Sequence, residues 1–410
     1  MRRVPRRAPG TVQTDGAVSP ARRLGRWARG ALTIATLVLI TTIAWPSMPV
    51  LPVATWLFLP GLLGLGLVAS MGLVAIGVVV RPMRRTTAMT GVALAASVLV
   101  VLAGQTRAGD AVGVGWWQGL GVGLDIDRGP PSPAGTMLVT YAHRGASPLV
   151  ADLWSPGPRH PATGRAVVWV HGGGWTGGHR SSRPRWDEWL TDRGVTVIDL
   201  DYTLADPMGP GRPTWDEAAA DVRCAVGWAQ GSEGADAAID PAKVTIAGYS
   251  AGATLALLAA WARHGDAVLG GAPAGCAEPS QPVASVAALY PVTDVASWVG
   301  NDPSGMRLGE FSAASYLGGQ PRDVVDRAAA ASPITLVRPG LAPTLLVHGE
   351  QDRIVSISQS ADLARRLQGA GDQVSLVRLP GAGHNFDVFW SSIPTRTARA
   401  HLARLLSVRA

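Results

Sequence analysis

The chain has 410 residues and a formal net charge of +7, but this charge is unevenly distributed. Residues 1–30 carry eight arginines and one aspartate, whereas the part after residue 103 holds 25 basic and 28 acidic residues. The basicity therefore belongs to the N-terminal end, where it favours contact with anionic lipid or a topology signal and does not indicate a nucleic-acid-binding surface. The length allows a membrane anchor plus one domain, or two ordinary domains.

The N-terminal third predicts a membrane anchor. Residues 1–30 are rich in arginine and proline and lack apolar clusters, so we expect a disordered basic tail. Residues 31–80 contain no charge, and their length fits two membrane-spanning helices joined by the proline-rich turn at 46–52. The uncharged stretch 86–106 is long enough for a third helix. We thus predict three transmembrane helices within residues 31–106, because a signal peptide has one apolar segment and core helices show polar faces.

Arginine placement predicts the orientation of these helices. Arginines precede the first predicted span and lie in the loop at 81–85, and basic loops stay on the cytoplasmic side. Three crossings then place residues 107–410 outside the cytoplasm, as part of a multi-pass protein of the cell membrane. We interpret residues 107–135 as a linker. Its Trp116 and Trp117 either lie at the outer lipid interface or pack on the following domain.

Apolar strand patterns and helical patterns take turns through residues 136–410. Strands are expected at 136–142, 147–154, 167–170, 195–200, 244–247, 283–290, 344–348 and 374–379, and helices at 186–192, 216–230, 251–264, 358–369 and 395–406. This alternation predicts an α/β fold, a doubly wound and mainly parallel sheet with helices on both faces. Functional sites in such sheets collect at the carboxyl ends of the strands.

One strand end carries the pattern Gly248-Tyr249-Ser250-Ala251-Gly252 between a buried strand and an Ala/Leu-rich helix. Small residues on both sides of a serine tolerate the strained turn that lifts its hydroxyl above the sheet edge. The pattern therefore predicts a nucleophile elbow with Ser250 as the nucleophile.

Another strand is followed by His171-Gly172-Gly173-Gly174-Trp175. Consecutive glycines free the backbone to point amides inward, so Gly172 and Gly173, together with the amide of Ala251, are candidates for an oxyanion hole. A phosphate-binding loop would need a following Gly-Lys-Ser/Thr, which the sequence lacks.

Two later loops supply candidate partners for the serine. Asp352 and His384 each follow a predicted strand, and the chain order serine, aspartate, histidine is that of an α/β-hydrolase triad. Glu350 is the nearest alternative acid, but Asp352 lies deeper in its loop and precedes an apolar pair. The four histidines interpreted as ordinary solvated side chains are His143, His160, His264 and His401.

From residue 136 onward the sequence resembles the esterase/lipase branch of the α/β-hydrolase superfamily. The likeness rests on the two glycine motifs above, on Asp201-Tyr202-Thr203-Leu204-Ala205, and on the segments that contain Asp352 and His384. It implies hydrolysis of carboxylic esters without a metal or organic cofactor. Residues 316–319 and 332–334 are similar to acyl-esterase-like and prolyl-peptidase-like members. Thr203 and Ala253 depart from the hormone-sensitive-lipase pattern, so we assign no subfamily.

Residues 294–327 are too long for a simple connection between two strands. We expect a partial lid or a wall of the acyl pocket, with Trp298, Met306, Phe311 and Tyr316 either lining it or packing a small core of their own. The two cysteines, Cys224 and Cys276, either form a disulfide, which an oxidising compartment permits, or remain thiols.

These observations predict a membrane-anchored serine hydrolase that acts on a small-molecule, lipid or glycan ester. Membrane lipid is the expected partner of the N-terminal helices, and no nucleic-acid partner is expected. The same triad serves amidases and peptidases, and an inactive hydrolase fold that only binds is a further alternative. A transporter is disfavoured because the predicted spans contain no ionisable residue that could line a polar path.

Overall fold

The computed structural model describes residue 71 and residues 84–114, 136–206, 211–301 and 307–409. The predicted basic tail, nearly all of the first two predicted spans, Trp116, Trp117 and Met306 lie outside the described residues.

The described residues form one eight-stranded sheet in the order β1-β2-β4-β3-β5-β6-β7-β8. The strands are β1 (Met137–Arg144), β2 (Ser147–Trp154), β3 (Ala166–Val170), β4 (Thr196–Leu200), β5 (Val244–Tyr249), β6 (Ser285–Leu289), β7 (Thr344–Gly349) and β8 (Val374–Leu379). The hairpin β1-β2 joins β4 in antiparallel pairing, and all pairs from β4 to β8 are parallel. The prediction of a mainly parallel sheet is confirmed, and each predicted strand is present with small changes at its ends.

Helices cover both faces of the sheet. One apolar core lies between the sheet and α6 (Ala218–Gln230), α8 (Ala251–Trp261) and α12 (Ser358–Ala370), and a second lies under α5 (Pro184–Thr191) and α13 (Ile393–Leu405). The central strand β3 is buried at every position, as its run of apolar residues requires when both faces are covered. The five predicted helices correspond to α5, α6, α8, α12 and α13, so all of them are present.

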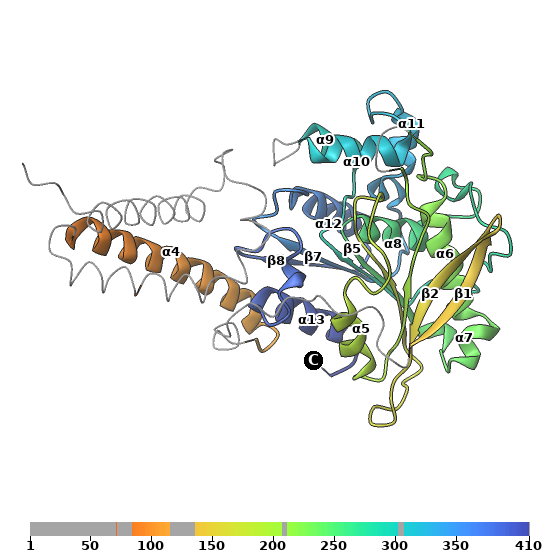
Figure 1. The fold of residues 1–410 in the computed structure, drawn as a ribbon, viewed down its shortest axis with the longest axis horizontal. Coiled ribbons are helices and arrows are strands. Elements are labelled where there is room, and N and C mark those ends of the chain that lie inside the picture. The colour runs from red at the N-terminus through yellow and green to blue at the C-terminus, as the bar shows by residue number, and fades with distance from the viewer. Residues whose placement is uncertain (1–70, 72–83, 115–135, 207–210, 302–306, 410) are drawn as a thin grey trace, which may run out of the picture.

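Short helices fill the connections. They are α7 (Ser232–Asp236), α9 (Val295–Gly300), α10 (Leu308–Leu317), α11 (Val325–Ala330) and the 3₁₀ turns η4 (Pro241–Lys243), η5 (Ala267–Leu269), η6 (Pro333–Leu336) and η7 (Phe386–Val388). Three of them, α9, α10 and α11, belong to the long connection between β6 and β7 and lie together on one side of the domain (Figure 1).

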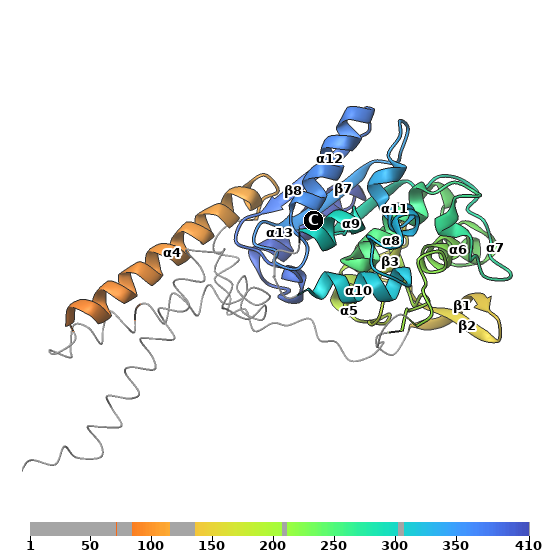
Figure 2. The same ribbon diagram turned by 90° about the horizontal axis from the view of Figure 1, so that it is seen from above.

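The helix α4 (Arg84–Asp110) contains the third predicted span and continues four residues beyond its expected end. Its segment Gly91–Asp110 is, by length and composition, the one helix of the described residues that could cross a membrane. Figures 1 and 2 show α4 projecting from the domain beside β8, at the opposite end of the sheet from the β1-β2 hairpin. Met89, Val92, Leu99 and Val100 expose more than half of their surface along this helix.

The C-terminal part of α4 packs against the domain. A methyl group added to Gly381 would lie 2.3 Å from Val101 Cγ1, and one added to Gly104 would lie 2.9 Å from Pro380 Cβ. Pro380 and Gly381 begin the loop after β8, which carries His384. This helix therefore contacts the loop that holds one of the predicted site residues.

A disulfide joins Cys224 in α6 to Cys276 in the connection before β6, across 52 residues of sequence. Of the two alternatives that the sequence leaves open, the structure has the bonded one.

Candidate active site

Ser250 occupies a sharp turn between β5 and α8. Its φ and ψ are 54° and −126°, a conformation that a residue other than glycine rarely adopts. The flanking glycines make the turn possible, because a methyl group on Gly252 would lie 2.2 Å from the carbonyl oxygen of His171 and one on Gly248 would lie 2.8 Å from that of Val170. The turn thus lies against the end of β3 at a distance that only glycine permits.

His384 lies between the serine and an acid. Its Nδ1 is 2.7 Å from Asp352 Oδ2, and its Nε2 is 3.0 Å from Ser250 Oγ. In the tautomer that donates Nδ1–H to the carboxylate, Nε2 is free to accept the serine hydrogen. Since the imidazole is 5% exposed, this arrangement is shielded from most solvent.

Asp352 is buried and fully hydrogen-bonded. It accepts from the amides of Ile354 and Val355 at 2.8 and 2.9 Å, and His348 Nε2 lies 3.3 Å from its Oδ2. Burial opposes its ionisation, but the nearby His384 and hydrogen bonds from both histidines outweigh burial and lower the pKa of Asp352 well below its usual range. The alternative acid, Glu350, instead bonds to Arg378 near the surface.

A cavity of about 500 Å³ opens at this point. It is lined by Ser250, His384 and all three predicted oxyanion-hole residues, Gly172, Gly173 and Ala251. Ala251 is the first residue of α8, so its amide has no acceptor within the helix. The structure therefore places five of the six predicted site residues on one cavity, and the sixth, Asp352, is hydrogen-bonded to His384.

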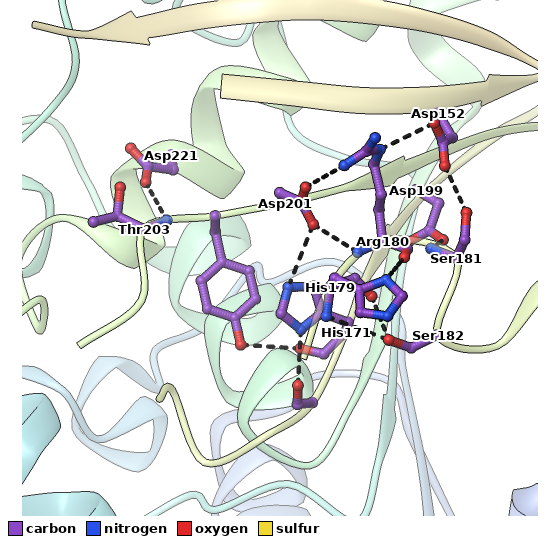
Figure 3. A network of polar contacts seen from close by, with 12 residues as sticks. Asp152, His171, His179, Arg180, Ser181, Ser182, Asp199, Asp201, Thr203 and Asp221 are labelled. Atoms are coloured by element: carbon purple, nitrogen blue, oxygen red, sulfur yellow. Dashed lines mark hydrogen bonds and ion pairs between the residues drawn. The ribbon is translucent and has the colours of Figure 1, made fainter. Parts of the chain in front are cut away.

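The ring of His171 contacts the glycine loop that follows it in the chain. Its ring stacks on Tyr202 with centroids 4.4 Å apart, its Nδ1 donates to Gly172 O at 2.8 Å, and its Nε2 lies 4.0 Å from Asp201 (Figure 3). Burial lowers the pKa of His171 to about 4. The ring is therefore neutral at pH 7 and acts as a packed hydrogen-bond donor.

The segment after the glycines is anchored by three aspartates. Arg180 bonds to Asp152 at 3.0 Å and to Asp201 at 2.5 Å, and the amide of Ser181 donates to Asp199 (Figure 3). Burial raises the pKa of Asp199 well above its usual value. These contacts tie the loop that bears the glycines to the ends of β2 and β4.

Aromatic side chains form the outer wall of the cavity. Trp298 of α9 and the exposed Phe311 of α10 both line it. Tyr316 does not, because it is buried and stacks on the lining residue Trp175 at 4.4 Å. The long connection therefore contributes both wall residues and packing residues.

Three residues without a predicted role lie next to the histidine loop: Tyr290 packs on the ring of His384, Asp387 accepts from Tyr290, and Arg183 donates to Asp387. No spacing pattern connects these three residues, so only the folded chain reveals them.

Of the four histidines expected to be solvated, His143 and His264 are exposed, whereas His160 and His401 are half-buried; His401 is half-buried because it lies on α13. Among the described residues, no group of three or more His, Cys, Asp or Glu side chains is arranged to hold a metal ion.

The fold and the turn at Ser250 define the class of protein, an α/β-hydrolase. A family model described as BD-FAE matches residues 152–367, just over half of the chain, and the chain belongs to that family.

Similar proteins carry esterase names. The chain is 30% identical over 263 residues to Esterase LipQ of Mycobacterium tuberculosis, covering 62% of this chain and 58% of LipQ. It is 26% identical to Esterase LipC of the same organism, covering 67% of each chain. The esterase Est2 of Thermogutta terrifontis superposes with a TM-score of 0.53 at 23% identity, over 68% of this chain and 94% of that one. The match to LipQ thus spans little more than half of that relative's length.

Proposed function

We propose that the protein is a membrane-anchored serine hydrolase that cleaves carboxylic esters through an acyl-enzyme. The observation that carries the proposal is the chain of hydrogen bonds from Ser250 through His384 to Asp352 at the wall of the cavity. Membership of the BD-FAE family and the esterase names of the relatives support it.

The proposed reaction begins when Ser250 Oγ attacks the ester carbonyl carbon and His384 Nε2 takes the serine proton. The negative charge on the former carbonyl oxygen is stabilised by the amides of Gly172, Gly173 and Ala251. His384 then protonates the leaving alcohol, which departs and leaves an acyl group on the serine. Water, activated by the same imidazole, releases the acid. Asp352 orients His384 and stabilises its positive charge in both steps.

The proposed organisation follows the sequence: a basic tail at 1–30, three transmembrane helices within 31–106, a linker to 135, and a catalytic domain at 136–410 outside the cytoplasm. The apolar helix α4 supports an anchor at its position. An anchor beside the catalytic domain suits a small-molecule, lipid or glycan ester of the cell envelope. A reporter that is active only in the cytoplasm should be silent when fused after residue 135, and its activity there would contradict the orientation.

The same triad can cleave amides, so an amidase or peptidase is the second candidate. The names of the relatives favour esters. A hydrolase fold that only binds is disfavoured, because such proteins typically lose one of the catalytic groups, and here Ser250, His384 and Asp352 form an unbroken chain of hydrogen bonds.

A fluorophosphonate probe tests the proposal, since it reacts with activated serines. The wild-type protein should be labelled and should hydrolyse short p-nitrophenyl esters faster than aminoacyl anilides, and Ser250→Ala should do neither. Faster hydrolysis of anilides would favour the second candidate. Labelling of Ser250→Ala would contradict the assignment of the nucleophile.

A further inference from the structure

Asp387 lies three residues after His384 and is completely buried. Its two carboxylate oxygens have different partners, since the hydroxyl of Tyr290 donates to Oδ1 and Arg183 Nε donates to Oδ2 at 3.3 Å. A buried carboxylate is costly unless it is paired and hydrogen-bonded, so both partners are needed to keep it there. We call Asp387, Tyr290 and Arg183 the Asp387 cluster. Its members come from three separate segments: η7, the end of β6 and the start of α5.

Tyr290 connects this cluster to the imidazole. Its ring meets the ring of His384 edge-on, with centroids 4.6 Å apart and planes at 62°. The residue is fully buried and has a φ of 41°, in a region that persists for a tyrosine only where the surroundings fix it. Burial, and then the Asp387 carboxylate, raise the pKa of Tyr290 well above its usual value, so its hydroxyl remains a donor.

Arg183 connects the cluster to the nucleophile. Its guanidinium lies 5.0 Å above the ring centroid of Tyr249, the residue that precedes Ser250. Arg183 also lines the cavity. The same side chain thus contacts the elbow on one side and the loop of His384 on the other.

We propose that the Asp387 cluster is a positioning device that sets the distance between His384 Nε2 and Ser250 Oγ. The inference rests on the proposed serine hydrolase function. Asp352 holds the imidazole at Nδ1 only, and a ring held at one atom can still tilt toward or away from the serine. The ring edge of Tyr290 restricts that tilt, and Asp387 fixes the backbone three residues further on. A displacement of about 1 Å is enough to slow a reaction about 100-fold.

Two nearly isosteric variants of the full-length protein test the proposal. Tyr290→Phe keeps the ring and removes the hydroxyl, and Asp387→Asn keeps the shape and removes the charge. Each should lower kcat on a neutral p-nitrophenyl ester by about 10- to 100-fold, with KM changed by less than about twofold. The rate of labelling by a neutral fluorophosphonate should fall by the same factor. The double variant should be no worse than the poorer single one, because Tyr290→Phe removes and Asp387→Asn weakens the same contact between these two residues.

Tyr141→Phe is the matched control. It also removes a buried tyrosine hydroxyl, which donates to the backbone oxygen of Asp201 at 2.6 Å, but it lies on the edge strand β1. The control should lower Tm and leave kcat within about twofold of the wild type.

The proposal is overturned if Tyr290→Phe behaves like the control, with a lower Tm but unchanged kcat and labelling rate. Since this variant is the milder of the two, it decides the question even where Asp387→Asn does not fold. The proposal is also overturned if Arg183→Gln raises KM for anionic esters alone and leaves the labelling rate unchanged, because Arg183 would then be a substrate contact. Failure of the proposed function has a different signature: an unlabelled wild-type protein that hydrolyses no ester.

Discussion

Ser250 Oγ and His384 Nε2 are 3.0 Å apart, but the two residues are held in place by different parts of the structure. The serine sits between β5 and α8 in a turn built by five consecutive residues, and its glycines allow the helix to approach β3. The histidine lies in a loop after β8 that contacts α4, the loop of Asp352 and the Asp387 cluster.

This comparison shows two ways to place a reactive group. A local turn needs only its own sequence and the strand next to it. A long loop has no such internal rigidity, so its position depends on neighbours from distant parts of the chain. We therefore expect the serine's geometry to tolerate remote substitutions and the histidine's geometry to respond to them.

Removal of either reacting group should cause the largest loss of activity. Ser250→Ala and His384→Ala should each lower kcat by about 10⁴ to 10⁶, and the double variant should be about as inactive as either one, because the two side chains act as a unit. Steady-state kinetics of folded variants measures this. Losses that multiply would show that Ser250 and His384 act independently, which contradicts a shared proton transfer between them.

The next effect concerns the acid. Asp352→Asn should lower kcat by about 10² to 10⁴, less than loss of the histidine, because Asp352 orients the imidazole without touching the reacting atoms. Glu350→Gln is the matched control and should leave kcat within about twofold, since Glu350 bonds to Arg378 instead. Equal losses in the two variants would contradict the choice of Asp352.

A smaller effect should follow from the contact between α4 and the histidine loop. Gly381→Ala should lower kcat about tenfold, because its new methyl group meets Val101. Gly371→Ala is the control, since Gly371 has a similar positive φ of 83° but nothing within 4 Å of an added methyl group. The second change Val101→Ala should restore part of the lost activity. If Gly381→Ala and Gly371→Ala behave alike, only backbone strain matters and α4 does not influence the histidine.

The last prediction concerns stability rather than turnover. The folded protein lowers the pKa of His171 from 6.5 to about 4, so the unfolded chain takes up this proton first. The stabilisation is therefore complete above pH 6.5 and is lost as the pH falls toward 4. At pH 4.5 the loss should be roughly 2 to 3 kcal/mol. Denaturant unfolding at pH 7 and 4.5 measures it, and His171→Asn should show a smaller difference. An equal difference in both proteins would show that other groups cause it.

Much of the fold could be predicted because the local patterns agree with one another. The all-apolar run of β3 and the turn residues around Ser250 each have one physically reasonable structure. The short helices of the β6–β7 connection were not predicted, because six to ten residues carry too weak a periodic signal. Asp387 was missed because a lone aspartate in a loop usually contacts solvent.

The sequence alone determined the succession of strands and helices along the chain and the elbow at Ser250. It also supplied the hypothesis that links Ser250 to Asp352 and His384. These depend on backbone conformation and on chain order, both of which are local or one-dimensional. The tertiary structure alone decided which side chains surround His384. It also decided that Cys224 and Cys276 form a disulfide and that α4 packs on the loop after β8. Such contacts join segments that are distant in the chain, so their partners become visible only when burial and distance are known.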